Sequence, residues 1–503
     1  MGTWTRSGHA LRTPLVLSAG RDATTAPAYA EGLLVSDRTE DGRFQVRISG
    51  SVFAPRVAEH PDDLPPTKGL PLSVADLEFP EEGGQGDLAV VASEGDLAQA
   101  ATADAIFLAN GPEFERSPRD FLRLIGRLRE ILGPAKVIAV TGLATPSNVS
   151  VLVYAGIDLV DSSRMVLDGA RGMFHTSDGC APISTVDRNA CGCPACSAGE
   201  SVQAHNEYAL HREVLLVRNH LSHSRLRELV ERRLANAPWN TAVVRHLDLR
   251  GYDLVEPYAP VAGGEMLAYA HESLHRPEIV RFRRRVRERY EKPPHAKILL
   301  LLPCSARKPY SASRSHRRFR QAIAASRNPS AVHEVIVTSP LGLVPRELES
   351  FYPARAYDIP VTGDWSRDEA SIVSEDLAAY VEANRYDAIV AHLGAEAQIV
   401  HAALPDAISS TKDHPSSDDS LVALTRALDQ VAGSTKPVTK GVRFTEEMTN
   451  IARFQFGEPG RQLLERATFR GRFPDVRVFR EGHQVAMHTG RGLLSLTLDG
   501  GEI

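Results

Sequence analysis

The stretch that decides the fold runs from residue 104 to residue 140 and reads DAIFLANGPEFERSPRDFLRLIGRLREILGPAKVIAV. It contains an apolar run at 105–108, then a segment with apolar residues at helical spacing, then a second apolar run at 136–140. Ser117 and Pro118 suit the start of a helix, because proline is well tolerated in a first helical turn. A strand, an amphipathic helix and a second strand form the repeating unit of a parallel sheet.

The same alternation continues beyond this unit. A Gly/Pro turn at 142–146 is followed by a short helical stretch and by a strand-like run at 157–161. Strands that alternate with helices over a segment of this length favour closure into a barrel. We therefore expect an α/β fold in which residues 1–235 form a (β/α)8 barrel.

A second α/β region begins further along the chain. The run KILLLLP at 297–303 is apolar throughout, which is typical of a central strand buried on both faces. With further strand candidates downstream, residues 236–435 are expected to form a three-layer α/β/α domain. Residues 436–503 alternate short apolar runs with turn residues, and they are predicted to be a small α+β module.

Composition indicates a soluble globular protein. The chain has 503 residues, of which 43% are hydrophobic and 24% charged, enough for several cores. Its net charge of -5 is small, so an RNA partner would have to bind local basic patches. The apolar runs are too short to span a membrane and the N-terminus lacks a signal-peptide pattern. We expect a cytoplasmic protein without membrane contact.

Three of the five cysteines lie within six residues, as Cys191-x-Cys193-x-x-Cys196. This spacing lets one turn offer three thiolates to a tetrahedral ion at little cost in loop entropy. His220 is the preferred fourth ligand because it lies in an apolar helical pattern, and the other candidates are His205, His211 and His223. We predict a structural zinc site with four protein ligands. The alternative is a group of buried or reactive thiols without metal.

A second group of reactive residues follows the strand at 297–303. Residues 303–316 read PCSARKPYSASRSH, and they lie where open α/β sheets bind their ligands. A thiol at Cys304 near Lys308 and His316 would have a lowered pKa and act as a nucleophile. Candidates to bind a polar substrate are the hydroxyls of Ser305, Tyr310, Ser313 and Ser315. The alternative is a basic, serine-rich surface loop with one packed cysteine.

The cysteine cluster and the segments at 142–146 and 155–162 resemble tRNA-guanine transglycosylases. The resemblance implies that Asp161 stands at the C-terminal end of a barrel strand, as that family's nucleophilic aspartate does. The first half of the chain contains no Asp-Ser-Gly-Gly-Phe-Gln-like segment, which the family also carries. A structural or substrate-positioning carboxylate is therefore the alternative for Asp161.

Residues 303–316 also match the pattern Pro-Cys-x-x-x-Lys-Pro-Tyr-x-x-Ser-x-Ser-His, which resembles archaeosine synthases, archaeal paralogues of the transglycosylases. The resemblance extends from about residue 100 to the end of the chain. It implies an enzyme that adds a nitrogen donor, lysine or glutamine, to the nitrile of 7-cyano-7-deazaguanine in the D-loop of tRNA. It also implies a homodimer and a downstream enzyme that completes archaeosine.

The chemistry that this family implies suits the residues present. A thiolate at Cys304 would add to the nitrile carbon, with His316 or Lys308 handling protons, and an amine would displace the resulting thioimidate. Direct attack by the donor amine, with Cys304 only positioning it, is the rival. Two other functions remain open, namely base exchange and a non-catalytic tRNA-binding accessory subunit.

Members of this family usually continue into an RNA-binding PUA domain, which we expect this chain to lack. The arginine-rich segment at 276–290 is a candidate substitute for contacts with phosphates. A solvated helix face is the alternative for that segment.

Overall fold

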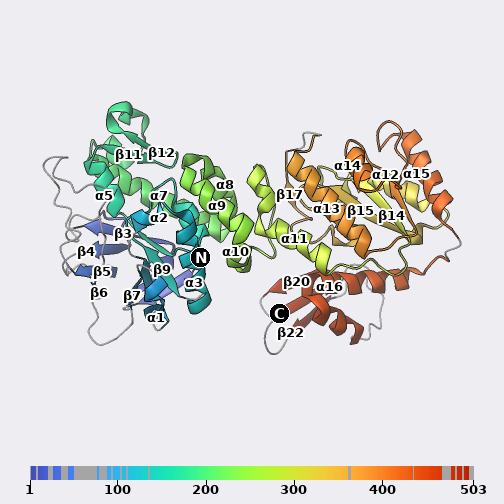
Figure 1. The fold of residues 1–503 in the computed structure, drawn as a ribbon, viewed down its shortest axis with the longest axis horizontal. Helices are drawn as coiled ribbons and strands as arrows, with labels where there is room; N and C mark the ends of the chain where they lie inside the picture. The colour runs from blue at the N-terminus through green and yellow to red at the C-terminus, as the bar shows by residue number, and fades with distance from the viewer. Residues whose placement is uncertain are drawn as a thin grey trace. The chain divides into compact units, whose positions relative to one another are not determined.

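The computed structural model describes residues 2–6, 9–20, 27–35, 44–49, 76–78, 88–91, 94–101, 103, 105–108, 111–133, 136–360, 364–433, 436–466, 477–481, 484–489 and 492–497. Two compact units divide the chain, Met1–Pro257 and Tyr258–Ile503. Figure 1 colours the first from blue to green and the second from yellow to red. The expected division into three domains at 235 and 435 remains a prediction.

The first unit is built on an eight-stranded sheet. The strands run in the order β6 (Asp76–Glu78), β5 (Phe44–Ser49), β4 (Gly32–Val35), β3 (Leu15–Gly20), β10 (Leu159–Asp161), β9 (Val137–Val140), β8 (Ala105–Leu108) and β7 (Leu88–Val91). Neighbours pair in parallel except β5 and β6. The outermost strands, β6 and β7, approach each other. A mixed α/β fold is confirmed.

Helices cover this sheet through the apolar faces that their sequences provide. In α3 (Pro118–Leu132), the apolar residues Phe121, Leu124, Ile125 and Leu128, which recur at helical spacing, are buried. The ring of Trp239, at the start of α9 (Pro238–Arg250), lies 5.6 Å from that of Phe121. Each such side chain contributes about 1.5–3 kcal/mol through burial. The remaining helices of this unit include α1 (Leu97–Ala100), α2 (Gly111–Phe114), α4 (Val149–Tyr154), α8 (Leu226–Arg233) and α10 (Tyr252–Val255).

The long helix α7 (Val202–Ser222) organises the end of the first unit. It packs against α5 (Ser163–Ala170) and the hairpin formed by β11 (Met173–Thr176) and β12 (Gly179–Pro182). Gly169 allows this close approach, because a Cβ there would lie 2.7 Å from the backbone nitrogen of Gln203. The Ser201 hydroxyl caps α7 by accepting a bond from the Ala204 amide. The first turn of α7 is thereby fixed beside the hairpin.

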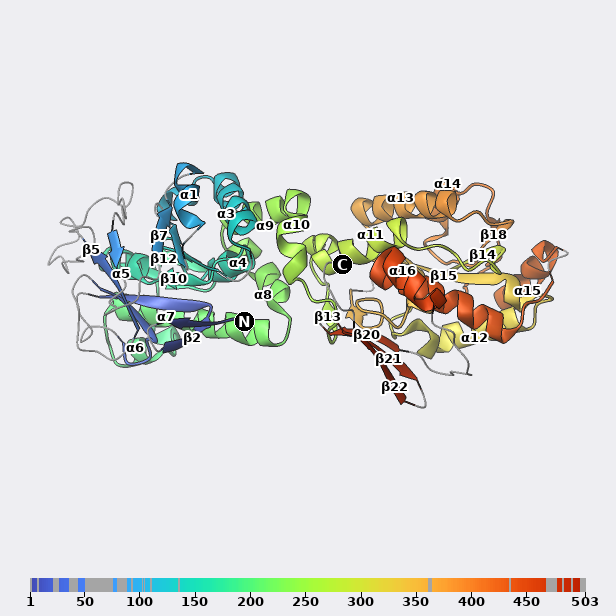
Figure 2. The same cartoon turned by 90° about the horizontal axis from the view of Figure 1, so that it is seen from below.

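The second unit has a five-stranded sheet with helices on both faces. Its order is β16 (Gly342–Pro345), β15 (Val332–Thr338), β14 (Ile298–Pro303), β18 (Ala388–Ala391) and β19 (Ile408–Ser409), with only β16 antiparallel. Leu300 and Leu302 of β14 join the core under α12 (Arg314–Ala324) and α15 (Asp418–Val431). Leu299 and Leu301 join the core under α11 (Pro277–Glu288) and α13 (Arg367–Ala383) (Figure 2). This is why β14 is apolar throughout.

The last part of the second unit contains α16 (Lys440–Arg466), which is interrupted at Gly457, where φ is 68°. An antiparallel sheet of β20 (Arg477–Glu481), β21 (Gln484–Thr489) and β22 (Gly492–Thr497) follows. In the part of the chain that the structure describes, every helix is too short or too polar to cross a bilayer.

Candidate functional site

Three cysteines and one histidine meet in the first unit. Nδ1 of His205 lies 3.7, 3.2 and 3.4 Å from the sulfurs of Cys191, Cys193 and Cys196. Neighbouring sulfur and nitrogen ligands of a tetrahedral zinc ion are about 3.6 Å apart, given the usual bond lengths. Cys193 is the N-cap residue of α6 (Pro194–Ser197), and its sulfur accepts a bond from the Cys196 amide. The three sulfurs and Nδ1 of His205 all lie within 4.8 Å of one another, so these four atoms could hold a metal ion.

His205 is oriented as a ligand by its surroundings. It lies in the first turn of α7 and stacks on Phe174, with ring centres 3.6 Å apart. Its Nε2 donates a hydrogen bond of 2.9 Å to the carbonyl of His175, which leaves the Nδ1 lone pair free for a metal. Burial lowers the pKa of His205, so the imidazole is held in the neutral form that ligation requires.

The prediction of His220 as the fourth ligand is wrong. Its Nδ1 donates to the carbonyl of Leu216, and its Nε2 accepts a bond from Arg232. His220 lies 15 residues after His205 on the same helix, which is a distance of about 22 Å. Only the first turn of α7 meets the cysteines, so the fourth position belongs to His205.

Asp161 ends β10 as a fully enclosed carboxylate. One oxygen accepts the Gly142 amide and the other accepts the Ser163 amide, both at 2.7 Å. The residue is 1% exposed, and burial raises its pKa. With both oxygens bonded to the backbone and no open face, Asp161 joins the loop at 142 to the start of α5. This geometry supports the structural alternative over the nucleophile.

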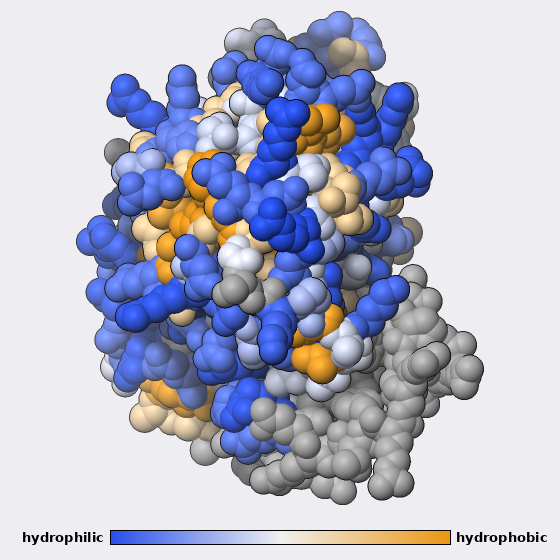
Figure 3. Space-filling model, turned by 90° about the vertical axis from the view of Figure 1, so that its right-hand side faces the viewer, coloured by the Kyte–Doolittle hydropathy of each residue, from blue (hydrophilic) through white to orange (hydrophobic). Residues whose placement is uncertain are grey.

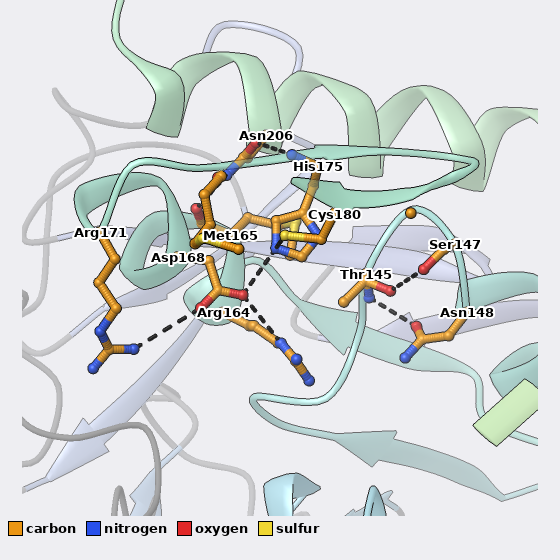
Figure 4. Close-up of polar contacts among 12 residues, drawn as sticks. Thr145, Ser147, Asn148, Arg164, Met165, Asp168, Arg171, His175, Cys180 and Asn206 are labelled. Carbon is orange, nitrogen blue, oxygen red and sulfur yellow. Dashed lines mark hydrogen bonds and ion pairs between the residues drawn. The ribbon is translucent and has the colours of Figure 1, made fainter. Parts of the chain in front are cut away.

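Figure 4 shows a polar cluster that the sequence did not indicate, built around the buried Asp168 and His175 with the exposed Cys180 at its edge. Nε2 of His175 is 2.8 Å from Asp168 and 3.4 Å from the sulfur of Cys180, while Arg164 and Arg171 pair with Asp168. A catalytic triad uses opposite nitrogens of its histidine, whereas here one nitrogen faces both partners. Burial raises the pKa of Cys180 to about 11, so its thiol is not activated. These residues therefore lack the geometry of a nucleophile and its base.

In the second unit, Cys304 follows directly after β14. Burial and the nearby carboxylate of Glu396 raise its pKa, whereas Thr338 and Lys308 oppose the rise. The sequence predicted a lowered pKa for this thiol, and the structure corrects that expectation because burial dominates. Cys304 is therefore a protonated thiol at rest, and a base must take its proton before it can attack.

Lys308 is held next to this thiol by an aromatic ring. Its Nζ lies 4.0 Å from the ring centre of Tyr357, and Cys304, Asp358 and Glu265 interact with its charge. Burial lowers the pKa of Lys308, although these groups oppose the change. A lysine with a lowered pKa is a suitable proton acceptor.

The Tyr357 hydroxyl bonds to Tyr310 and to Thr338, at 2.6 Å each. Tyr357 lies on β17 (Tyr357–Asp358) and Thr338 is the last residue of β15. Sequence reasoning did not single out these two as site residues. For Thr338 the available signal was that β15 is the parallel neighbour of β14, so both strands end at one edge of the sheet. No such signal applied to Tyr357, because β17 pairs with β13 (Met266–Leu267) in a separate sheet.

His316 points away from this chemistry. It is fully buried, its Nε2 donates to the Pro303 carbonyl at 3.0 Å, and its Nδ1 accepts a bond from Arg346 at 2.7 Å. Burial and the Arg346 charge lower its pKa to about 3. A neutral imidazole with both nitrogens bonded has no free position for a substrate proton. The structure therefore gives His316 a positioning role, in place of the predicted proton transfer.

The remaining hydroxyl candidates differ in their surroundings. Ser313 caps α12 by accepting the His316 amide, and Ser315 bonds to Ser313 at 3.1 Å. Ser305 donates to the carbonyl of Arg307. Tyr310 alone among the four reaches the Lys308 site, through its bond to Tyr357. The structure thus brings together Cys304 and Lys308 and uses Ser313 to begin the helix that follows.

Comparison with known proteins finds one matching family model in each of the two units. A family model described as queuine tRNA-ribosyltransferase matches residues 96–238, and a domain of unknown function matches residues 279–428. An archaeosine synthase of Haloferax volcanii is 38% identical over 85% of this chain and 73% of its own length. Archaeosine synthase subunits alpha of Methanosarcina acetivorans and Thermoplasma acidophilum are 34% and 32% identical, over 84% and 76% of this chain and 71% and 70% of their own lengths.

Proposed function

Because this chain belongs to the archaeosine synthase family, we propose that it is a tRNA-modifying transferase of archaeosine biosynthesis. Its substrates would be tRNA that carries 7-cyano-7-deazaguanine in the D-loop and an amino-acid nitrogen donor, lysine or glutamine. The observation that carries the proposal is the electrostatic interaction of Cys304, directly after β14, with the half-buried Lys308, whose Nζ lies over the Tyr357 ring. An electrophilic nitrile carbon can be attacked by such a thiol once a base has taken its proton.

The proposed reaction has two steps that balance in atoms and protons. Neutral Lys308 takes the proton of the Cys304 thiol, the sulfur bonds to the nitrile carbon, and the nitrile nitrogen gains that proton, which gives a thioimidate. The donor amine then adds to the same carbon, the carbon–sulfur bond breaks, and the amine proton returns to the leaving sulfur. The product is an amidine. In the rival route the donor amine attacks directly and Cys304 only positions it.

The Cys191, Cys193, Cys196 and His205 cluster is proposed to hold zinc as a structural ion. Three sulfurs and one imidazole nitrogen are a donor set that zinc favours, and four protein ligands leave no position for substrate. A bound ion would fasten the cysteine segment to α7. The approach of β6 to β7 supports closure of the first sheet into a (β/α)8 barrel. A homodimer, a downstream enzyme and a cytoplasmic location remain predictions.

The decisive experiment incubates the protein with nitrile-bearing tRNA and labelled lysine or glutamine, followed by mass analysis of the nucleosides. One label should enter the modified nucleoside, and Cys304→Ser and Lys308→Met should abolish its entry. Cys180→Ser is the matched control, because Cys180 is a non-activated thiol in the other unit. Incorporation of neither label would favour the accessory-subunit alternative. Full activity of Cys304→Ser would eliminate the thioimidate route.

Base exchange is the second candidate function, and the geometry of Asp161 weighs against it. Asp161 is 1% exposed and both of its oxygens accept backbone amides, so the carboxylate is enclosed and not open to a nucleoside. Exchange of labelled guanine into tRNA would reveal this activity directly.

A further inference from the structure

Positive charge is concentrated in one part of the second unit. Residues 292–333 contain nine lysines and arginines and no aspartate or glutamate, in a chain whose net charge is -5. This stretch comprises β14, the loop with Cys304, α12 and the start of β15. Its charge is therefore local to the proposed catalytic loop.

Three of these arginines form a row on α12. Arg314, Arg317 and Arg320 are exposed, while His316, Phe319 and Ile323 on the opposite face are buried. Residues three apart lie on one helix face, and the row spans about 9 Å along the axis. Among the described residues, none of the three guanidinium groups makes an ion pair with a carboxylate or a hydrogen bond.

Neighbouring arginines, in contrast, already have partners. Arg318, on the flank of the same helix, pairs with Asp418. On α11, which the sequence suggested as the phosphate-binding segment, Arg283 and Arg287 share the carboxylate of Asp376, and Arg281 bonds to the Pro260 carbonyl. These groups would have to break existing bonds to reach a phosphate. The row on α12 would not.

The row is also fixed with respect to the catalytic loop. Ser313 caps α12 directly before Arg314, and the bond from His316 to the Pro303 carbonyl ties its first turn to the end of β14. The helix that carries the three arginines is therefore anchored at the end of β14, directly next to Cys304. Figure 3 looks onto the side of the second unit on which Figure 1 draws α12 and α15, and this surface is mainly hydrophilic with small separate apolar patches.

We propose that Arg314, Arg317 and Arg320 bind the phosphates of tRNA next to the nucleotide that is presented to Cys304. This inference rests on the proposed function and adds the RNA-contacting face. A nucleic-acid strand places one charge about every 3.4 Å of its axis, so a row of about 9 Å covers roughly three phosphates. Arginine suits this role because its planar guanidinium binds phosphate oxygens in pairs.

The test replaces all three arginines by glutamine and measures the Kd for nitrile-bearing tRNA at several salt concentrations. The logarithm of the association constant falls as the logarithm of the salt concentration rises, and each lost phosphate contact should make this slope shallower by about 0.7–0.9. The slope of the triple variant should therefore be shallower than that of the parent by about two to three. The matched control is Arg119→Gln, Arg123→Gln and Arg127→Gln, an exposed row on α3. In that row Arg123 and Arg127 pair with acidic side chains. This control variant removes the same charge, and the slope of its salt dependence should stay within about 0.5 of that of the parent.

Donor incorporation at saturating tRNA separates this inference from the proposed function. The triple variant should raise KM for tRNA at least tenfold and keep kcat within about threefold, with a circular dichroism spectrum like that of the parent. If the parent transfers the label while both triple variants bind tRNA equally, the arginine row is not the RNA face although the function stands. An equal loss of binding to polyglutamate would indicate general anion attraction and would overturn the inference too.

Discussion

The ammonium group of Lys308 lies over the ring of Tyr357, with Nζ 4.0 Å from the ring centre. Such a contact contributes about 0.5–2 kcal/mol, depending on its exposure. The Tyr357 hydroxyl is bonded to Tyr310 and Thr338, so the ring is a fixed platform. The platform holds the lysine beside Cys304 in one orientation.

Replacement of Tyr357 should separate the effect of the ring from that of the hydroxyl. Tyr357→Leu removes the platform and should lower kcat for donor incorporation about tenfold, because Lys308 loses its fixed position. Tyr357→Phe keeps the ring and should lower kcat less. Steady-state kinetics with KM for tRNA measured in parallel will show this, and equal losses in both variants would contradict a role for the ring.

The rate of donor incorporation should depend on pH through Lys308. Burial lowers the pKa of this lysine, so the neutral base forms at a lower pH than for an exposed lysine, which titrates at about 10.4. The rate should rise with pH and level off below that value. In Lys308→Arg the side chain stays protonated, so the rate should be low near neutral pH and should rise only where Cys304 itself ionises, at a pH that burial of this thiol raises. A pH profile of single-turnover rates checks both statements, and an unchanged profile in the variant would assign the base elsewhere.

Metal content should follow His205 and not His220. His205→Ala removes the nitrogen that lies among the three sulfurs and should lower bound zinc well below one ion per chain, with a lower Tm. His220→Ala should retain the metal, since both its nitrogens are bonded elsewhere. Elemental analysis and calorimetry provide the measurement. The opposite pattern, with the metal lost only from His220→Ala, would restore the sequence-based assignment.

The free energy of unfolding should fall in acid because the Glu347 carboxyl becomes protonated. Burial alone would raise the pKa of this carboxyl, but the adjacent His333 and the Tyr290 hydroxyl lower it on balance. A carboxyl with a lowered pKa contributes stability above its unfolded pKa, about 4.3, and loses it as pH falls through the folded value.

Glu347→Gln should therefore lower Tm near neutral pH, and its difference from the parent should shrink below about pH 4. Calorimetry between pH 3 and 7 tests this expectation. Glu375→Gln is a control, because Glu375 is an exposed residue bonded only to Ser371 in the described structure. A constant Tm difference across the range would show that the charge of Glu347 is not the cause.

Periodicity was sufficient to predict several elements. The apolar face of α3 and the doubly buried strand β14 follow from residue spacing and hydrophobicity alone. The fourth metal ligand does not follow in this way, because His205 and His220 lie on one helix and only the packing of α7 against the β11–β12 hairpin decides which end meets the cysteines. Sequence therefore identified the donor types and three of the four positions in the cluster.

Side-chain direction limited the prediction of the catalytic loop. His316 lies twelve residues after Cys304, which suggested a shared site. In the structure its side chain is directed to the Pro303 carbonyl at the end of β14. Tyr357 lies far from Cys304 in the sequence and reaches the loop only through β17. Proximity along the chain indicated Lys308 correctly as a neighbour of the thiol, whereas the aromatic platform depended on tertiary structure.

The bond between His316 and the Pro303 carbonyl makes the end of β14 and the first turn of α12 one rigid piece. The interval from Cys304 to Arg314 is then a set length, and an inserted or deleted residue between them would have to be absorbed within the loop itself. If RNA binds at the arginines, this interval fixes the distance between the bound phosphates and Cys304. The nucleotide to be modified would then be selected by its distance along the strand from those phosphates, independently of contacts with the base.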